Sequence, residues 1–146
     1  MKISSITISA ILLLLPIQAN ATDVFEVRAS ATDATFYRQG KVEKDKKGDE
    51  VVYLVDIPKG IVTRTAVYVK NLDKSAGGGV QSDNSVYTIV HDDPKDMLVN
   101  GQRIIKAVGK VAALDGYETI VIGEDFVTTS KSVADYFVLY YYKRIQ

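Results

Sequence analysis

Several residue types are missing or scarce in this chain of 146 residues, and each absence excludes a class of protein. The chain has no cysteine, so it is not a domain held together by disulfides. It has no tryptophan and a single histidine, His91. Its 18 basic and 18 acidic residues cancel, so the charge balance does not favour binding to nucleic acid.

Long apolar runs are confined to the start of the chain. Lys2 precedes an apolar stretch centred on residues 11–15, and Ala19-Asn20-Ala21 follows as a cleavage site. This order predicts a secretory signal peptide over residues 1–21, and no later stretch reaches the ~20 apolar residues of a membrane span. We expect residues 22–146 in the bacterial periplasm, at the cell surface or outside the cell. Thr22 stands where a bacterial lipoprotein needs cysteine, so no lipid anchor is expected.

Residue usage favours β-structure throughout residues 22–146. This part contains 19 Val, 8 Ile and 9 Thr but only 5 Leu. Side chains branched at Cβ lose rotamers in a helix and pack well on a pleated sheet. Residues 51–57 also show the period-two alternation of a strand. We therefore expect one predominantly β domain over residues 22–146.

Turn signals divide this domain into short strands. Pro58-Lys59-Gly60, Asn100-Gly101 and Asp115-Gly116 are expected to reverse the chain, because glycine and asparagine tolerate a positive φ. Asp92-Asp93-Pro94 is a further expected turn. Short helices are left open over residues 93–98 and 130–136. The alternating segments predict strands over residues 24–31, 35–44, 51–57, 61–70, 86–90, 103–114, 117–123 and 133–143.

This succession of strands and turns predicts an all-β fold. We expect an antiparallel β-sandwich of the Ig-like, Greek-key type with seven or eight strands. A small β-barrel is the alternative. Segments that are apolar on both faces, such as residues 51–57 and 136–142, favour the sandwich. The stretch 73–85, with Gly77-Gly78-Gly79, is expected to be a long loop within the single domain rather than a linker.

The chain offers little for catalysis. A Ser-His-Asp arrangement would depend on His91, and no Gly-x-Ser-x-Gly motif presents a serine. His91, Asp92, Asp93 and Asp96 supply possible ligands, but their spacing matches neither a zinc nor a calcium motif. Gly77-Gly78-Gly79 lacks the Lys-Ser/Thr of a phosphate-binding loop. We therefore expect no enzyme, no metal site and no cofactor.

Tyrosine is the abundant aromatic residue, with nine in the chain. Its ring is apolar and its hydroxyl is polar, which suits a binding surface. Tyr136, Tyr140 and Tyr142 fall on one face of a predicted strand. If this face is exposed, they form a rigid patch for binding another protein. The alternative is that their rings cover the margin of the core.

The expected new N-terminus offers a second candidate surface. Phe25, Val27, Ala29 and Ala31 alternate with polar residues, so this strand can pair with its own sheet or with the edge of another molecule. In this layout the chain resembles the subunits of chaperone-assembled fimbriae. The C-terminal tyrosines end at Tyr142 and not at the penultimate position, which departs from the pattern common in those subunits.

The sequence thus predicts a non-enzymatic exported protein that acts through protein–protein contacts. One version is a structural subunit of a surface assembly, similar to a fimbrial subunit, which exchanges residues 25–31. The other version is a periplasmic binding protein, inhibitor or immunity-type protein that blocks a secreted hydrolase or toxin. Its site would be the tyrosine strand together with Gly77-Gly78-Gly79. The partner is a protein in both versions, and its identity stays open.

Overall fold

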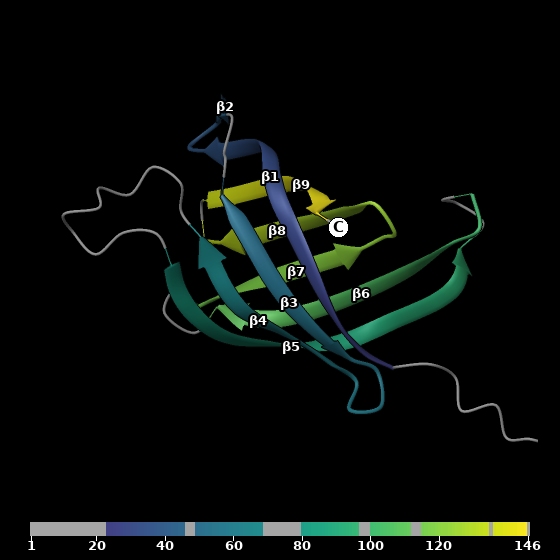
Figure 1. The fold of residues 1–146 in the computed structure, drawn as a ribbon. Coiled ribbons are helices and arrows are strands. Elements are labelled where there is room, and N and C mark those ends of the chain that lie inside the picture. The colour runs from purple at the N-terminus through teal and green to yellow at the C-terminus, as the bar shows by residue number, and fades with distance from the viewer. Residues whose placement is uncertain are drawn as a thin grey trace, which may run out of the picture.

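The computed structural model describes residues 23–45, 49–68, 80–96, 100–111, 115–134 and 136–145, with only the backbone for residues 80–83. The expected signal peptide and Gly77-Gly78-Gly79 lie outside the described residues. Within these ranges the chain forms nine strands and no helix (Figure 1). The strands are β1 (Val24–Arg38), β2 (Lys41–Asp45), β3 (Glu50–Asp56), β4 (Ile61–Tyr68), β5 (Val80–Asp96), β6 (Gln102–Val111), β7 (Gly116–Ile122), β8 (Phe126–Val133) and β9 (Tyr136–Ile145).

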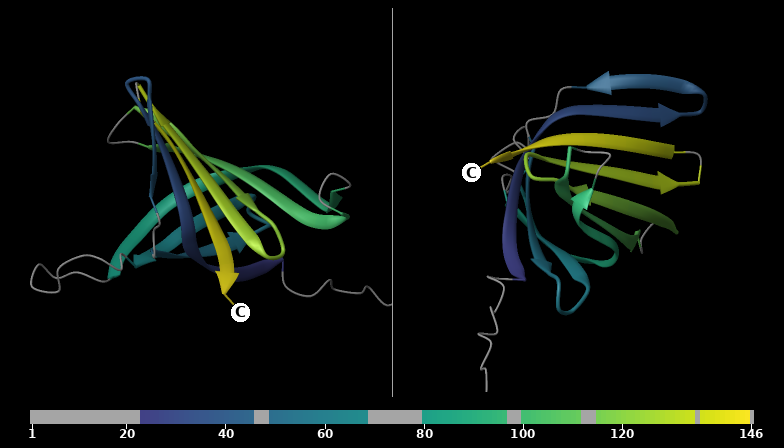
Figure 2. Two further views of the ribbon diagram at one scale, coloured as in Figure 1. Left: turned by 90° about the horizontal axis from the view of Figure 1, so that it is seen from above. Right: turned by 90° about the vertical axis from the view of Figure 1, so that its right-hand side faces the viewer.

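The strands form one antiparallel sheet that closes on itself. Their order is β2-β1-β3-β4-β5-β6-β7-β8-β9, and β1 pairs in addition with β9. Strands β1 and β3 to β9 therefore make an eight-stranded barrel, and β2 is an extra strand beside the end of β1 (Figure 2). The predicted sandwich is wrong, and the alternative of a small β-barrel is confirmed.

Strand β3 shows why the sandwich prediction fails. Val51, Tyr53 and Val55 belong to the core cluster, yet the alternate positions Val52 and Asp56 are also buried. A strand with buried residues on both faces suits a sandwich and a barrel wall equally well. The pairing of β1 with β9 decides between the two folds, and it joins residues too far apart in the chain to leave a local signal.

Strand β1 is long because one of its edges pairs first with β3 and then with β2. Its residues 24–30 pair with β3, and its residues 34–38 pair with β2. Its opposite edge pairs with β9 over residues 28–38. The strands predicted over residues 24–31 and 35–44 are thus one continuous strand followed by the short β2.

Three of the predicted turns are found. Gly60 has a φ of 66°, and its amide donates to the carbonyl of Ile57 at 2.9 Å. Asn100 and Gly101, directly before β6, have φ values of 57° and 75°. Asp115, directly before β7, has a φ of 46°. These residues adopt the left-handed conformation that their types tolerate best.

The turn predicted at Asp92-Asp93-Pro94 is wrong. The helix left open over residues 93–98 is wrong for residues 93–96, and residues 97 and 98 lie outside the described residues. Strand β5 continues through this segment to Asp96. The register against β6 shifts between Asp93 and Asp96, and Pro94 falls within that shift. Proline has no backbone N–H to donate to a ladder, so an irregular position is where a strand accommodates it.

Strand β8 occupies a segment where no strand is predicted before residue 133. Its residues Thr128-Thr129-Ser130-Lys131-Ser132 show no apolar alternation. Thr129 is nevertheless fully buried, beside the fully buried Val127 two positions earlier. The inward face of β8 is therefore built partly from threonine, and the helix left open over residues 130–136 is wrong.

Side chains fill the interior of the barrel. Residues branched at Cβ favour strands, and strands surround this interior. The β-structure predicted from residue usage is therefore confirmed. Glu118 and Thr129 are polar residues buried among the apolar ones. The buried core cluster comprises Val27, Ala29, Ala31, Val51, Tyr53, Val55, Val62, Tyr87, Ile105, Ala107, Ile120, Ile122, Val127 and Tyr142.

Candidate functional site

The N-terminal segment predicted as a binding strand lies in the barrel wall. Val27, Ala29 and Ala31 are buried in the core cluster, and Phe25 packs against it. Over residues 28–30, β1 pairs with β3 on one edge and with β9 on the other. These side chains therefore contact the protein's own core. Donation of this strand to another molecule stays a prediction.

The three candidate tyrosines share one face of β9, and this face points into the barrel. Tyr142 is 6% exposed, and Tyr140 packs against the core cluster. The ring centres of Tyr140 and Tyr142 lie 5.9 Å apart, and Tyr136 lies 6.2 Å from Phe36 of β1. Burial raises the pKa of Tyr140 to about 12, and it also raises the pKa of Tyr142. This face of β9 is mainly an interior surface.

The outer face of β9 carries the intervening residues. Phe137, Leu139 and Tyr141 are 37%, 41% and 45% exposed. Tyr37 of β1 places its ring 5.6 Å from that of Phe137, and Phe126 of β8 stacks on Tyr141 at 6.3 Å. These five residues form an apolar row across three adjacent strands, named here the outer β9 stripe.

The sequence contains a signal for this stripe. The alternation that places Tyr136, Tyr140 and Tyr142 on one face places Phe137, Leu139 and Tyr141 on the other. Both faces are apolar and aromatic, so the alternation alone does not tell which face is covered. The exposed members of the strand are therefore those that the sequence analysis did not select.

A buried ion pair lies inside the barrel. Nη1 of Arg64 donates to Oε1 of Glu118 at 2.9 Å, and the Tyr87 hydroxyl donates to Oε2 of Glu118 at 2.9 Å. The side chains of Arg64 and Glu118 are 14% and 6% exposed. The guanidinium carbon lies 5.7 Å from the centre of the Tyr87 ring, within the range of a cation–π contact. Strands β4, β5 and β7 each contribute one member of this network.

This network was not predicted from the sequence, although the sequence carries a signal for it. Glu118 stands at a buried position that alternates with Ile120 and Ile122, and Arg64 follows the buried Val62 by two residues. A charge on the apolar face of a strand needs a partner of opposite sign. Identifying that partner requires the strand order, which local patterns do not supply.

Tyr53 lies beside this network and is fully buried. It is the cross-strand neighbour of Arg64 in the pairing of β3 with β4. Its hydroxyl oxygen is the one buried side-chain nitrogen or oxygen atom, among the described residues, that has no hydrogen-bond partner. Burial raises the pKa of Tyr53, and the nearby Tyr142 raises it further. A buried hydroxyl left without any partner costs about 1–3 kcal/mol.

A cavity of about 230 Å³ opens beside the ion pair. It is named here the Arg64 cavity. Two acidic and two basic side chains share its wall with two tyrosines and two valines. The lining residues are Asp49, Val51, Arg64, Val67, Glu118, Lys131, Tyr140 and Tyr142.

Two other hollows are less promising as sites. One of about 220 Å³ includes Arg103 and Arg144 in its wall. Both arginines are already engaged, because Arg103 pairs with Asp92 and Arg144 donates to the carbonyl of Gly123 at 3.1 Å. The other hollow, of about 340 Å³, lies between the β1–β2 turn and the start of β9.

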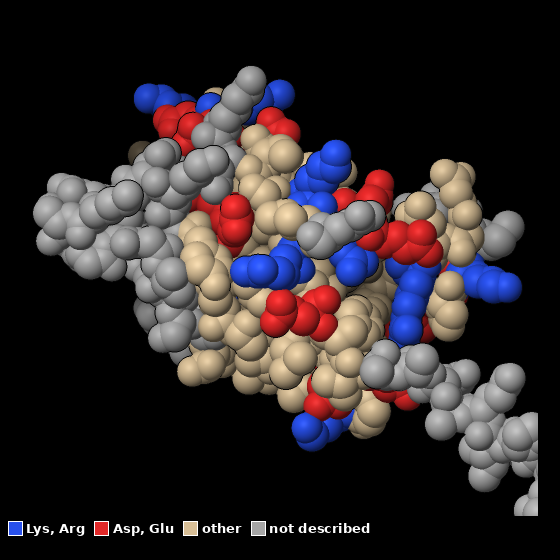
Figure 3. Space-filling view, in the orientation of Figure 1, with Lys and Arg blue, Asp and Glu red and all other residues tan. Residues whose placement is uncertain are grey.

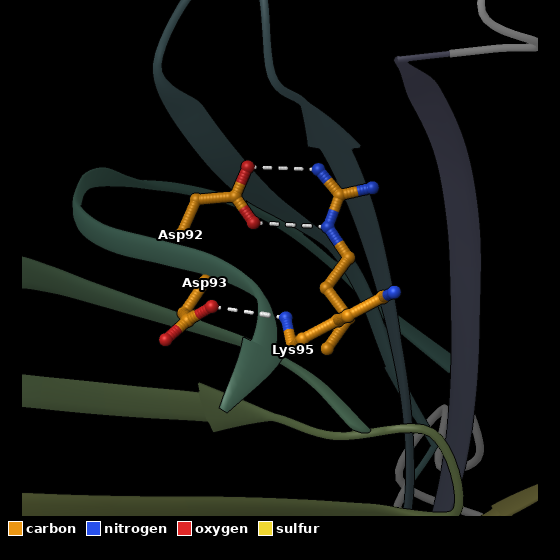
Figure 4. Close-up of polar contacts among 4 residues, drawn as sticks. Asp92, Asp93 and Lys95 are labelled. Atoms are coloured by element: carbon orange, nitrogen blue, oxygen red, sulfur yellow. Dashed lines mark hydrogen bonds and ion pairs between the residues drawn. The ribbon is translucent and has the colours of Figure 1, made fainter. Parts of the chain in front are cut away.

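The structure brings together three of the four possible metal ligands of β5. Donor atoms of His91, Asp93 and Asp96 lie within 4.8 Å of one another. Asp92 instead accepts two hydrogen bonds from Arg103, at 2.9 and 2.8 Å. Asp93 accepts a hydrogen bond from the backbone amide two residues on (Figure 4). One imidazole and two carboxylates fall short of the ligand set of a structural zinc site.

Charges of both signs are mixed on the molecular face that β1 and β3 cross (Figure 3). Asp56, at the end of β3, pairs with Lys59 at 2.7 Å. The side-chain hydrogen bond from Lys59 lowers the pKa of Asp56. Among the residues coloured in that view, no large area carries a single sign. On this face the coloured residues form no continuous basic surface for a polyanion.

No helix within the described ranges has the length and apolar character needed to cross a membrane. Comparison with models of protein families, with curated proteins and with solved structures finds no match to this chain. The side chains and cavities of the barrel are therefore the basis for assigning a function.

Proposed function

We propose that this protein is exported, is not an enzyme, and acts by binding another exported protein through the outer β9 stripe. The observation that supports the proposal is the apolar row on the outer face of three adjacent strands, which is exposed except for the half-buried Phe126. Its members are Tyr37, Phe126, Phe137, Leu139 and Tyr141. Tyrosine and phenylalanine are enriched in protein interfaces, where they provide large contact areas.

The stripe is also well ordered for binding. Tyr37 contacts Phe137, and Phe126 stacks on Tyr141, so each ring is already held by a neighbour. A side chain that is fixed before binding loses little conformational entropy when the partner arrives. The strands beneath are paired on both edges, which provides a rigid support.

The place of residues 25–31 favours a binding or inhibitory role over strand exchange. Donation of this segment would remove Val27 and Ala29 from the core and open the pairing between β1 and β9. Binding through the outer β9 stripe leaves the barrel closed. A secreted hydrolase or toxin is a suitable class of partner, and a second copy of this chain in a surface assembly is the alternative.

A matched pair of variants tests the proposal. Leu139→Ser places a hydroxyl in the stripe, whereas Leu54→Ser makes the same change on β3 at nearly equal exposure, 40% against 41%. The two sites lie far apart along β1, because Leu54 pairs with Glu26 and Leu139 pairs with Thr35. Wild-type and variant proteins are immobilised and exposed to envelope and culture fractions of the producing cells. Sedimentation measures self-association in parallel.

We expect Leu139→Ser to weaken partner capture or self-association at least tenfold, and Leu54→Ser to leave it unchanged. Loss of self-association identifies a second copy as the partner, and loss of capture identifies another protein. Equal binding by the two variants contradicts the assignment of the stripe. Melting curves of both variants show that each remains folded.

A further inference from the structure

We propose that His91, Asp93 and Asp96 of β5 form an open binding site for a divalent transition-metal ion of the zinc type. Donor atoms of these three side chains lie within 4.8 Å of one another, and the rest of the described chain contains no second group of this kind. Strand β5 is not a neighbour of β9 in the sheet, so this site is independent of the outer β9 stripe.

An irregularity in β5 brings the two carboxylates to one face of the sheet. In a regular strand, Asp93 and Asp96 would point to opposite faces, because successive side chains alternate. The register against β6 shifts between them, so that Asp93 pairs with Ile104 and Asp96 pairs with Gln102. Ile104 and Gln102 are two positions apart and share a face of β6, so Asp93 and Asp96 share a face as well.

His91 lies on this same face. It pairs with Lys106, which alternates with Ile104 and Gln102 along β6. The three partners across the ladder thus supply one positive charge, that of Lys106, against the two carboxylates of the group. The excess of negative charge favours a bound cation.

The remaining aspartate of this segment is turned away from the group. Asp92 accepts two hydrogen bonds from Arg103, at 2.9 and 2.8 Å (Figure 4). It pairs with Ile105, whose side chain belongs to the core cluster. Asp92 and Arg103 therefore form a separate ion pair on the other face of the hairpin, and Asp92 serves as a neighbouring carboxylate outside the site.

The burial of the three side chains decreases from one end of the site to the other. Asp96 is 9% exposed, Asp93 is half-buried and His91 is exposed. Donors on a tetrahedral zinc ion lie about 3.4 Å apart, because each bond to nitrogen or oxygen is about 2.0–2.2 Å long. Closing the group from 4.8 Å requires only side-chain rotation, for which the exposed His91 has room.

The donor set indicates the class of metal. A structural zinc site is closed by four protein ligands, whereas an open site has three and leaves a position for water. Imidazole nitrogen suits zinc, copper and nickel, while calcium and magnesium prefer oxygen ligands alone. One imidazole and two carboxylates therefore favour a transition-metal ion over an alkaline-earth ion.

Zinc titration of the untagged protein tests the proposal. His91 is the one histidine of the chain, so the imidazole signals in NMR spectra report on this residue alone. Calorimetry measures the affinity for Zn²⁺, with Ca²⁺ and Mg²⁺ as comparison ions. His91→Ala and Asp93→Asn each remove one ligand, and Asp92→Asn is the matched control. Melting curves without metal show that each variant is folded.

We expect one Zn²⁺ per chain and a shift of the imidazole signals. His91→Ala and Asp93→Asn should each weaken binding at least tenfold, whereas Asp92→Asn should bind as the wild type does. An imidazole shift with unchanged affinity in Asp93→Asn would identify a lone surface histidine and overturn the proposal. No zinc binding, tighter binding of Ca²⁺ or Mg²⁺ than of Zn²⁺, or an equal loss in Asp92→Asn would also overturn it.

Discussion

Arg64 on β4 and Glu118 on β7 meet inside the barrel, with Nη1 2.9 Å from Oε1, although β5 and β6 separate their strands in the sheet. Tyr87 of β5 donates to the same carboxylate. The contact therefore links three strands across the interior, in addition to the backbone ladders that link neighbours. Because both charges are nearly buried, their separation should cost far more than the loss of a surface pair.

Glu118→Gln should lower the free energy of unfolding by about 3 kcal/mol, since it leaves Arg64 buried without the carboxylate that compensates it. Asp92→Asn is the matched control. It removes the charge that pairs with Arg103, whose side chain is 36% exposed, and should cost under about 1 kcal/mol. Urea unfolding of both variants measures the two losses. Equal losses would show that the interior pair behaves as a surface pair does.

Gly109→Ala should destabilise the barrel by about 2 kcal/mol, because the added Cβ collides with the ring of Tyr87. Displacement of this ring also disturbs its hydrogen bond to Glu118. Lys110→Ala, at the next and exposed position, should change stability little. Thermal or urea unfolding compares the two variants. A stable Gly109→Ala protein would mean that the ring moves without loss.

Asp56 should contribute to the loss of stability in acid. Its hydrogen bond from Lys59 lowers the folded-state pKa below the ordinary value of 3.8. The stabilisation is present above pH 3.8 and is lost as the pH falls through the lower folded-state pKa. Asp56→Asn removes this contribution, so the difference in unfolding free energy from the wild type should shrink across that range. A difference independent of pH would contradict the assignment.

Tyr140 should make the barrel sensitive to alkali. Burial raises its folded-state pKa to about 12 from the ordinary 10.0. The unfolded chain therefore loses this proton first, and stability falls as the pH rises from about 10 through about 12. Tyr140→Phe should reduce this fall. Unfolding measurements at increasing pH test it, and tyrosinate absorbance of the native protein should show one late-titrating group fewer in the variant.

The leader prediction can be tested on the protein isolated from its producing cells. Cleavage after Ala21 should leave Thr22 as the first residue, which the intact mass reports. Ala21→Arg replaces the small residue at the cleavage site and should leave the leader attached. An unprocessed wild-type chain in the cytoplasm would contradict export.

The strands are largely visible in the sequence because their signals are local. Alternation and branching at Cβ identify β3, and Asn100-Gly101 marks the start of β6. Strand β8 was not predicted because Thr129 takes a buried position that the alternation rule assigns to an apolar residue. Closure of the barrel was not predicted because it depends on the pairing of β1 with β9, which leaves no local signal.

The candidate sites also separate into features with a local sequence signal and features that depend on the whole sheet. The sequence identifies β9 as unusual, but its two faces are both rich in aromatic residues. The curvature of the closed sheet covers Tyr142 and exposes Tyr141. Curvature is a property of the whole sheet, so no local pattern could have made that choice. The Arg64–Glu118 pair likewise depends on which strands face each other across the interior.

The pairing of β1 with β9 also has a kinetic consequence. The second edge of β1, over residues 28–38, pairs only with residues 136–145. The sheet therefore stays open until β9 has been synthesised. Contacts between such distant parts of a chain slow folding, and the open edges of β1 and β8 can pair with other chains meanwhile. Loss of β9 should therefore produce an aggregating sheet and not a smaller folded domain.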